Sequence, residues 1–83
     1  MQAQAAGIAK DFARAAKLYE QVIAIAPSRP EAYINLGLIR QNAGALDEAE
    51  RLYRRAIKLA PKMAIPYLNL GVVHVRRGEE DAA

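Results

Sequence analysis

The sequence repeats itself at an interval of 34 residues, and this period limits the possible folds more than any other feature. Downstream pairs of identical residues at this interval include Tyr33 and Tyr67, Asn35 and Asn69, Leu36 and Leu70, Gly37 and Gly71, and Gly44 and Gly78. Upstream pairs include Ala15 and Ala49, Leu18 and Leu52, Tyr19 and Tyr53, and Ile23 and Ile57. Agreement on both sides indicates a chain built from copies of one structural unit.

Residues 28–61 have the pattern of one complete unit, two helices joined by a tight turn. Ser28 and Glu31 have the spacing of a capping box, and Pro30 stands in the first turn, where no backbone donor is lost. Gly44 supplies the left-handed residue that a helix end favours, and Pro61 stops the second helix. The sequence therefore predicts one helix ending near residue 43 and a second ending near residue 60.

The upstream residues contain part of the same unit. From Asp11, whose side chain can accept hydrogen bonds at a helix N-terminus, apolar residues follow the i, i+3, i+4, i+7 spacing of an amphipathic helix as far as Pro27. Residues 1–10 are rich in Ala and Gln, so they would form a frayed helix or stay partly disordered. We predict a helix from about residue 11 to residue 27.

Downstream of Pro61, a fourth helix is expected from near Ala64 to Gly78, and residues 79–83 would begin a fifth. The chain then divides into a partial repeat at 1–27, a complete repeat at 28–61 and a partial repeat at 62–83. Eighty-three residues allow one small domain. The predicted fold class is all-α.

Two motifs resemble the signature of the tetratricopeptide repeat (TPR) family, whose period is about 34 residues. The first-helix motif, Tyr-x-x-Leu-Gly, occurs at 33–37 and again at 67–71. The second-helix motif is Ala, an aromatic residue four positions later and a closing Pro, as in Ala49, Tyr53 and Pro61. The resemblance implies an α-solenoid in which antiparallel helix pairs stack into a right-handed superhelix.

Small residues in these motifs predict close packing between helices. Gly37 and Gly71 would let a neighbouring helix approach, and Tyr19 and Tyr53 would fill the space between consecutive units. Arg40 stands where the family usually has an aromatic or apolar residue.

The family resemblance also implies a function, because first helices of TPR repeats line a concave face that usually binds an extended peptide or a partner helix. By position, the groove residues would be Glu31, Ile34, Asn35, Leu38, Gln41, Asn42, Ile65, Leu68, Asn69, Val72, Val75 and Arg76. Asn35 and Asn69 could grip a peptide backbone, since an amide offers both a donor and an acceptor. Hydrogen bonding between helices is their alternative role. A protein or peptide partner and a scaffolding function are therefore expected.

Other functions find little support in the composition. With one Ser, one His, no Thr and no Cys, a catalytic constellation would need Ser28 and His74 from different repeats, so no enzyme is expected. His74 has no second ligand at helical spacing, and we expect no metal or cofactor there but a role in packing or at a polar edge. No apolar run approaches the roughly 20 residues that span a bilayer. No targeting signal is visible, which leaves the cytoplasm as the default location.

The charge of +3 permits acidic partners without requiring them. Its main cluster on the second helix of the complete repeat comprises Arg51, Arg54, Arg55 and Lys58. The pairs expected to neutralise part of it are Asp47 with Arg51 and Glu50 with Arg54. Because aromatic platforms are missing, we expect a solvated convex face and no nucleic-acid partner.

The partial repeats at both ends predict self-association. Repeat arrays bury their core only against neighbours, so the last helix of one molecule would dock on the helix around Leu18 and Tyr19 of another. Leu70 and Val73 would contribute from the last helix. The alternatives are a monomer with frayed ends and the substrate-recognition arm of a larger enzyme.

Overall fold

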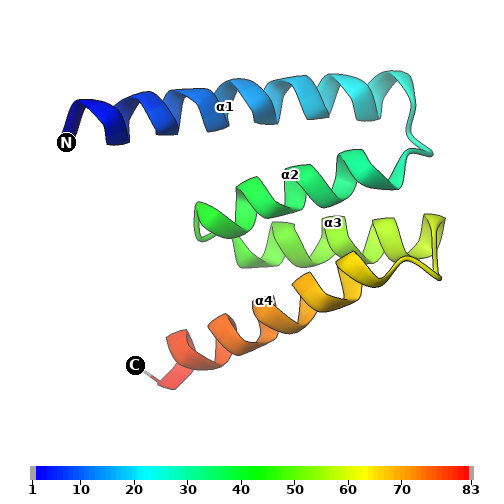
Figure 1. Ribbon diagram of the computed structural model, residues 1–83. Helices are drawn as coiled ribbons and strands as arrows, with labels where there is room; N and C mark the ends of the chain where they lie inside the picture. Colours follow the sequence, from blue (N-terminus) through cyan, green and yellow to red (C-terminus); the bar gives the residue numbers. More distant parts are fainter. Residues whose placement is uncertain (1, 83) are drawn as a thin grey trace.

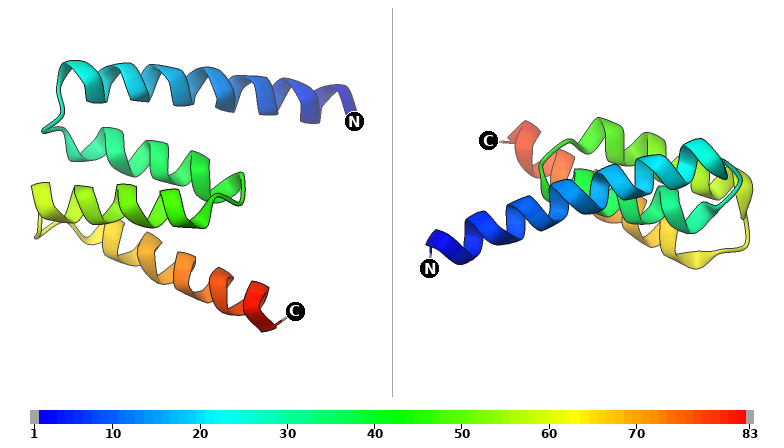
Figure 2. Two further views of the ribbon diagram at one scale, coloured as in Figure 1. Left: turned by 180° about the vertical axis from the view of Figure 1, so that it is seen from behind. Right: turned by 90° about the horizontal axis from the view of Figure 1, so that it is seen from above.

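Four antiparallel helices stacked side by side make up the computed structural model, which describes the backbone of residues 2–82 and the side chains of residues 11–80 (Figure 1). The helices are α1 (Gln2–Ile25), α2 (Pro30–Asn42), α3 (Leu46–Leu59) and α4 (Ala64–Ala82). Contacts join α1 to α2, α2 to α3 and α3 to α4, so neighbours in sequence are neighbours in space (Figure 2). The prediction of an all-α helical repeat is confirmed.

The stack is a slab of 39 × 35 × 17 Å, so its short dimension is less than twice the diameter of about 10–12 Å of one helix with its side chains. Every helix therefore keeps part of its circumference exposed. A fold of this kind offers long surfaces for binding and little enclosed volume.

Both terminal helices are longer than the sequence pattern predicts. Asp11 lies in the interior of α1, because the Ala-rich residues before it have high helix propensity and continue the same helix. At the other end, α4 runs through Gly78 to Ala82, so the predicted stop at Gly78 is wrong and residues 79–82 begin no separate helix. Gly78 has no positive φ, unlike Gly44 at φ 85°.

The predicted capping box at Ser28 and Glu31 is not formed. The N-cap of α2 is Arg29, at φ −92° and ψ 106°, and no side chain caps this helix. The helix thus begins one residue too late for the Ser–Glu spacing, with Pro30 as its first residue. At the other end, Gly44 takes the left-handed conformation as predicted, and its N–H donates to the Gln41 carbonyl at 3.0 Å.

Tyr53 is the centre of the packing between α2, α3 and α4. Its side chain is fully buried, and its hydroxyl donates to Gln41 Oε1 at 2.7 Å. A Cβ added at Gly37 would lie only 2.6 Å from Tyr53 Cε1. The glycine therefore lets α3 approach α2 closely, as predicted, and the structure adds that the Tyr53 ring rests on it. Burial raises the pKa of Tyr53 to about 12, although the nearby Arg76 charge lowers it in part, so the phenol stays a donor at neutral pH.

Apolar side chains pack on both sides of Tyr53 in two clusters. The cluster between α3 and α4 contains Leu46, Ala49, Tyr53, Leu70 and Val73. The cluster toward α2 contains Tyr33, Ile34 and Ala56, with Ile23, Leu52, Leu59 and Met63 packed against it. Most of the hydrophobic stabilisation therefore comes from contacts of α3 with its two neighbours.

Two arginines tie the helices together at the surface. Arg40, in its half-exposed site, contacts Glu20 of α1 at 2.5 Å and Glu48 of α3 at 3.0 Å, which explains why a charge is accepted where the family pattern has an apolar residue. Arg77 of α4 reaches Asp47 at 2.8 Å and Glu50 at 2.6 Å on α3.

Of the two ion pairs predicted within α3, one is formed and the other is not. Glu50 pairs with Arg54 at 2.9 Å, as predicted. Asp47, however, pairs with Arg77 and not with Arg51, because α4 brings a guanidinium across from the next helix.

Stability should fall as the pH drops through the acidic range, in part through Glu50. Hydrogen bonds from Arg54 and then from Arg77 lower its pKa below the usual value of a glutamate in the folded chain. A group with a depressed folded pKa stabilises the fold above its unfolded pKa and loses that contribution as the pH falls through the folded value. We expect Glu50→Gln to flatten the dependence of the urea midpoint on pH between neutral pH and the acidic range. Equal slopes for wild type and Glu50→Gln would contradict the assignment.

Candidate protein-binding surfaces

The side chains of α2 form two adjacent stripes with different surroundings. The covered α2 stripe, which packs against α3, consists of Ile34, Gly37 and Gln41. The open α2 stripe, exposed or partly exposed, consists of Glu31, Asn35, Leu38 and Asn42. Only the second can meet a partner without disturbing the chain.

The predicted groove residues Ile34 and Gln41 are therefore misplaced. Each side chain is only 6% exposed: Ile34 packs with Ala56, and Gln41 accepts the Tyr53 hydroxyl bond. Neighbouring side chains on an α-helix point about 100° apart. Because Ile34 directly precedes Asn35, the two side chains face different surroundings.

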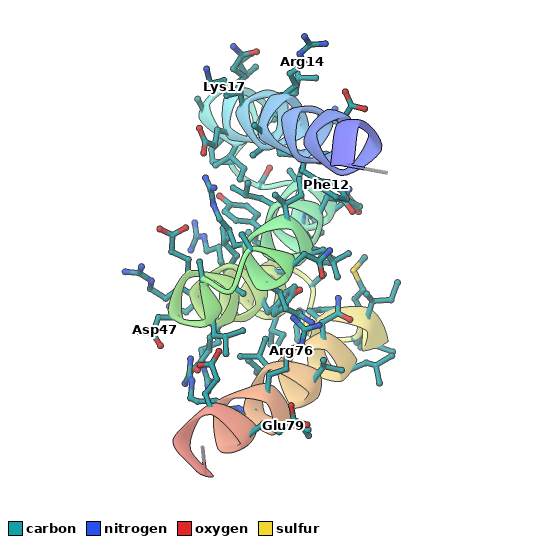
Figure 3. The ribbon with its side chains drawn as sticks, turned by 90° about the vertical axis from the view of Figure 1, so that its left-hand side faces the viewer. Phe12, Arg14, Lys17, Asp47, Arg76 and Glu79 are labelled. Atoms are coloured by element: carbon teal, nitrogen blue, oxygen red, sulfur yellow. The ribbon has the colours of Figure 1, made fainter. Side chains whose placement is uncertain are left out.

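Asn35, Leu38 and Asn42 help to line a hollow of about 300 Å³ between α1 and α2, which we term the α1–α2 hollow. Its full lining is Phe12, Ala15 and Tyr19 from α1 with Asn35, Leu38, Ile39 and Asn42 from α2. Phe12 points from α1 toward α2 (Figure 3) and keeps 45% of its surface exposed. Aromatic and aliphatic walls with a few polar groups are the usual make-up of a binding site.

Four residues that line the hollow were not predicted for the groove: Phe12, Ala15, Tyr19 and Ile39. For Phe12, the 34-residue repeat offers a way to predict contact with α2. Phe12 precedes Leu46 by 34 positions, and Leu46 packs against Leu70 and Val73 of the following helix α4. Phe12 takes the same place against its own following helix, α2.

Apart from Glu31 on α2, the remaining predicted groove residues lie on α4, outside the α1–α2 hollow. Another depression, of about 530 Å³, is lined by Leu68, Gly71, Val72, Val75, Arg76 and Glu79. In Figure 3, Arg76 and Glu79 lie on one side of the stack and Asp47 on the other. Of the predicted groove residues, three line the α1–α2 hollow, namely Asn35, Leu38 and Asn42.

Two polar side chains of α4 have distinct environments. Arg76 extends toward α2, where its Nη1 donates to the Gln41 carbonyl oxygen at 3.1 Å, a favourable position for a cation at a helix C-terminus. The Nδ2 of Asn69 is buried and has no hydrogen-bond partner in the described part of the chain. Asn69 is consequently not in a helix-to-helix hydrogen bond through that atom.

Comparison with known proteins agrees with this architecture. The family model described as a tetratricopeptide repeat matches residues 8–62, which is more than half of the chain. The chain belongs to the tetratricopeptide repeat family. TPR repeats generally mediate protein–protein interactions, and the family is typically a non-enzymatic interaction module. A search of curated proteins found no match.

The residues predicted for self-association of this TPR chain differ in accessibility. Leu18 is 61% exposed and Tyr19 is partly buried. Leu70 and Val73, by contrast, are buried against α3 within the same chain, so the prediction that they meet another molecule is wrong. They belong to the side of α4 that faces the preceding repeat.

The basic residues Arg51, Arg54, Arg55 and Lys58 are all exposed on α3, as predicted for a solvated face. His74 is exposed as well, which leaves the polar-edge role of the two that were expected for it. Among the described residues, no His, Cys, Asp and Glu side chains gather in a group of three that could hold a metal ion. None of the described helices combines the length and apolarity needed to cross a membrane.

Proposed function

We propose that this TPR chain binds a peptide or a partner helix in the α1–α2 hollow and so acts as a protein-interaction or scaffolding module. The hollow supports this role because it joins exposed apolar walls, Phe12 and Leu38, to the amides of Asn35 and Asn42. Apolar side chains of a ligand would cover the walls. Amides would bond its backbone, which is the same for every sequence.

Asn35 is the central polar contact in this proposal. It lies on α2 in the lining of the hollow, where a bound backbone could offer both a carbonyl and an N–H. Asn69 stands one repeat later on α4, and a turn of its side chain outward would exchange an unpartnered Nδ2 for a bond to ligand. The two amides would then contact successive parts of one extended ligand.

The proposed role is binding without catalysis. Neither Ser28 nor His74 lines the α1–α2 hollow, and the two residues stand on different repeats. A nucleophile and its base have to lie within hydrogen-bonding distance to act together.

Short random peptides displayed on phage and selected against the wild-type chain provide ligands for a test of this site. For a selected peptide, Asn35→Ala should raise the dissociation constant by about tenfold, which corresponds to about 1.4 kcal/mol. Asn69→Ala should also weaken binding. Isothermal titration calorimetry on the purified variants measures both effects.

Gln21→Ala is the matched control, since Gln21 is an exposed amide on α1 that does not line the hollow. It should leave the affinity unchanged. If Asn35→Ala and Gln21→Ala bind the selected peptides equally well, the backbone-contact mechanism is refuted. Failure of the selection to enrich any peptide would argue against the binding function itself.

A further inference from the structure

One face of α4 is open although the equivalent face of α2 is covered by α3. The open α4 stripe consists of Leu68, Gly71 and Val75, which follow the covered α2 stripe Ile34, Gly37 and Gln41 by 34 residues each. Leu68 is 70% exposed and Val75 is 63% exposed. Nothing lies within 4 Å of a Cβ added at Gly71, whereas one at Gly37 would meet Tyr53. The α4 stripe therefore has the shape that receives an α3-like helix.

The complementary face is present on α1. Its α1 stripe consists of Leu18, Val22 and Ile25, which are 61%, 37% and 85% exposed. These residues precede Leu52, Ala56 and Leu59 by 34 positions, and those three side chains of α3 pack in the cluster with Tyr33 and Ile34 of α2. Figure 3 shows Arg14, one turn before Leu18, on the side of α1 that points away from α2. The chain thus exposes, on α4 and α1, the equivalents of the two faces that α2 and α3 pack together within the molecule.

We propose that copies of this chain associate head to tail, with the α1 stripe of one molecule packed on the α4 stripe of the next. Tyr19 would then lie over Gly71 as Tyr53 lies over Gly37. This contact uses different surfaces on its two partners, so it leaves a free stripe at each end and continues the helical stack from molecule to molecule. It goes beyond the proposed peptide binding, since Tyr19 is shared with the lining of the α1–α2 hollow but Asn35 and Asn42 take no part.

The intermolecular contact rests on apolar burial, because the polar contacts of the α2–α3 pair have no equivalents in it. At the positions equivalent to the Arg40–Glu48 ion pair, the intermolecular contact would place His74 opposite Arg14. At the positions equivalent to the Tyr53–Gln41 hydrogen bond, it would place Tyr19 opposite Val75. Added salt screens charge pairs and leaves apolar association intact. The assembly should consequently persist in high salt.

Sedimentation equilibrium over a range of concentrations tests the proposal. The average mass of the wild-type chain should rise with concentration beyond the 9.1 kDa monomer, at low and at high salt. Leu68→Asp and Leu18→Asp should each raise the dissociation constant by at least about tenfold, since a charge would be buried in an apolar contact. A wild-type chain that stays monomeric at every concentration overturns the proposal.

Mixing the two variants tests the head-to-tail geometry. Leu68→Asp keeps its α1 stripe and Leu18→Asp keeps its α4 stripe, so the equimolar mixture should form a dimer that grows no further. A mixture that stays monomeric, or a Leu18→Asp chain that dimerises by itself through α4, overturns this geometry. Ile65→Asp is the matched control: Ile65 is 54% exposed on the same helix, but its equivalent Glu31 remains exposed beside α3. Its association should equal that of the wild type.

Gly71→Leu separates association from folding. Because the site is empty within the molecule, the variant should keep the wild-type circular dichroism while its leucine blocks the approach of Tyr19. The expected result is a dissociation constant at least about tenfold higher. Undiminished association of this variant would contradict the proposed packing.

Discussion

Tyr53→Ala should lower the free energy of unfolding by about 3–5 kcal/mol, the usual cost of removing a large buried aromatic side chain. The side chain is fully buried and contacts both neighbouring helices, so no single rearrangement can fill the cavity. For 83 residues, the expected total is only about 4–12 kcal/mol at roughly 0.05–0.15 kcal/mol per residue. At the lower end of this range the variant would be partly unfolded at room temperature. Urea denaturation followed by circular dichroism measures the loss.

Two further tyrosine variants sharpen this test. Tyr53→Phe keeps the ring but leaves Gln41 Oε1 buried without its donor, at a cost of about 1–3 kcal/mol. Tyr67→Ala, one repeat after Tyr33, removes a ring that is 50% exposed and a hydroxyl bond of 3.1 Å to the Pro61 carbonyl, at a cost of about 1 kcal/mol. Equal losses for Tyr53→Ala and Tyr67→Ala would show that Tyr53 is not the centre of the packing.

Gly37→Leu should destabilise the chain by about 1–3 kcal/mol, the usual cost of overpacking. Even the first atom of the new side chain would lie 2.6 Å from Tyr53 Cε1, and this ring is held by the two helices around it. The equivalent change Gly71→Leu meets no atom within 4 Å. It should be neutral or stabilise α4 by up to about 1 kcal/mol through helix propensity.

Both glycine variants are compared by urea denaturation at a concentration low enough for the wild-type chain to be monomeric. The informative quantity is the difference between the two variants in the free energy of unfolding that each loses. Equal losses at Gly37 and Gly71 would mean that the cost arises from the helix itself and not from the contact with Tyr53.

The period of 34 residues was sufficient to predict the helical stack and a close approach of helices at Gly37. It placed Gly37 and Tyr53 in one unit, and their packing follows from the need to bring two helices close at a residue without a side chain. Gly44 was equally predictable, because a left-handed residue is needed where α2 turns into α3.

The helix ends and the orientation of α2 were less predictable. No residue in the sequence stops α1 before Asp11 or α4 at Gly78, since helix-forming residues continue on both sides. The groove prediction treated Ile34 and Asn35 as equivalent, although one residue of difference turns a side chain from solvent into the core. The bond from Arg77 to α3 depends on how α4 is placed, which no local pattern encodes.

The most direct test of the account is an amide chemical-shift map of the chain with a selected peptide bound. The account predicts the largest shifts at the α1–α2 hollow, around Phe12, Asn35 and Leu38, with little change at Arg51 and Arg55 on the exposed face of α3. Shifts concentrated on that basic face, with the hollow unchanged, would contradict the assignment of binding to the hollow.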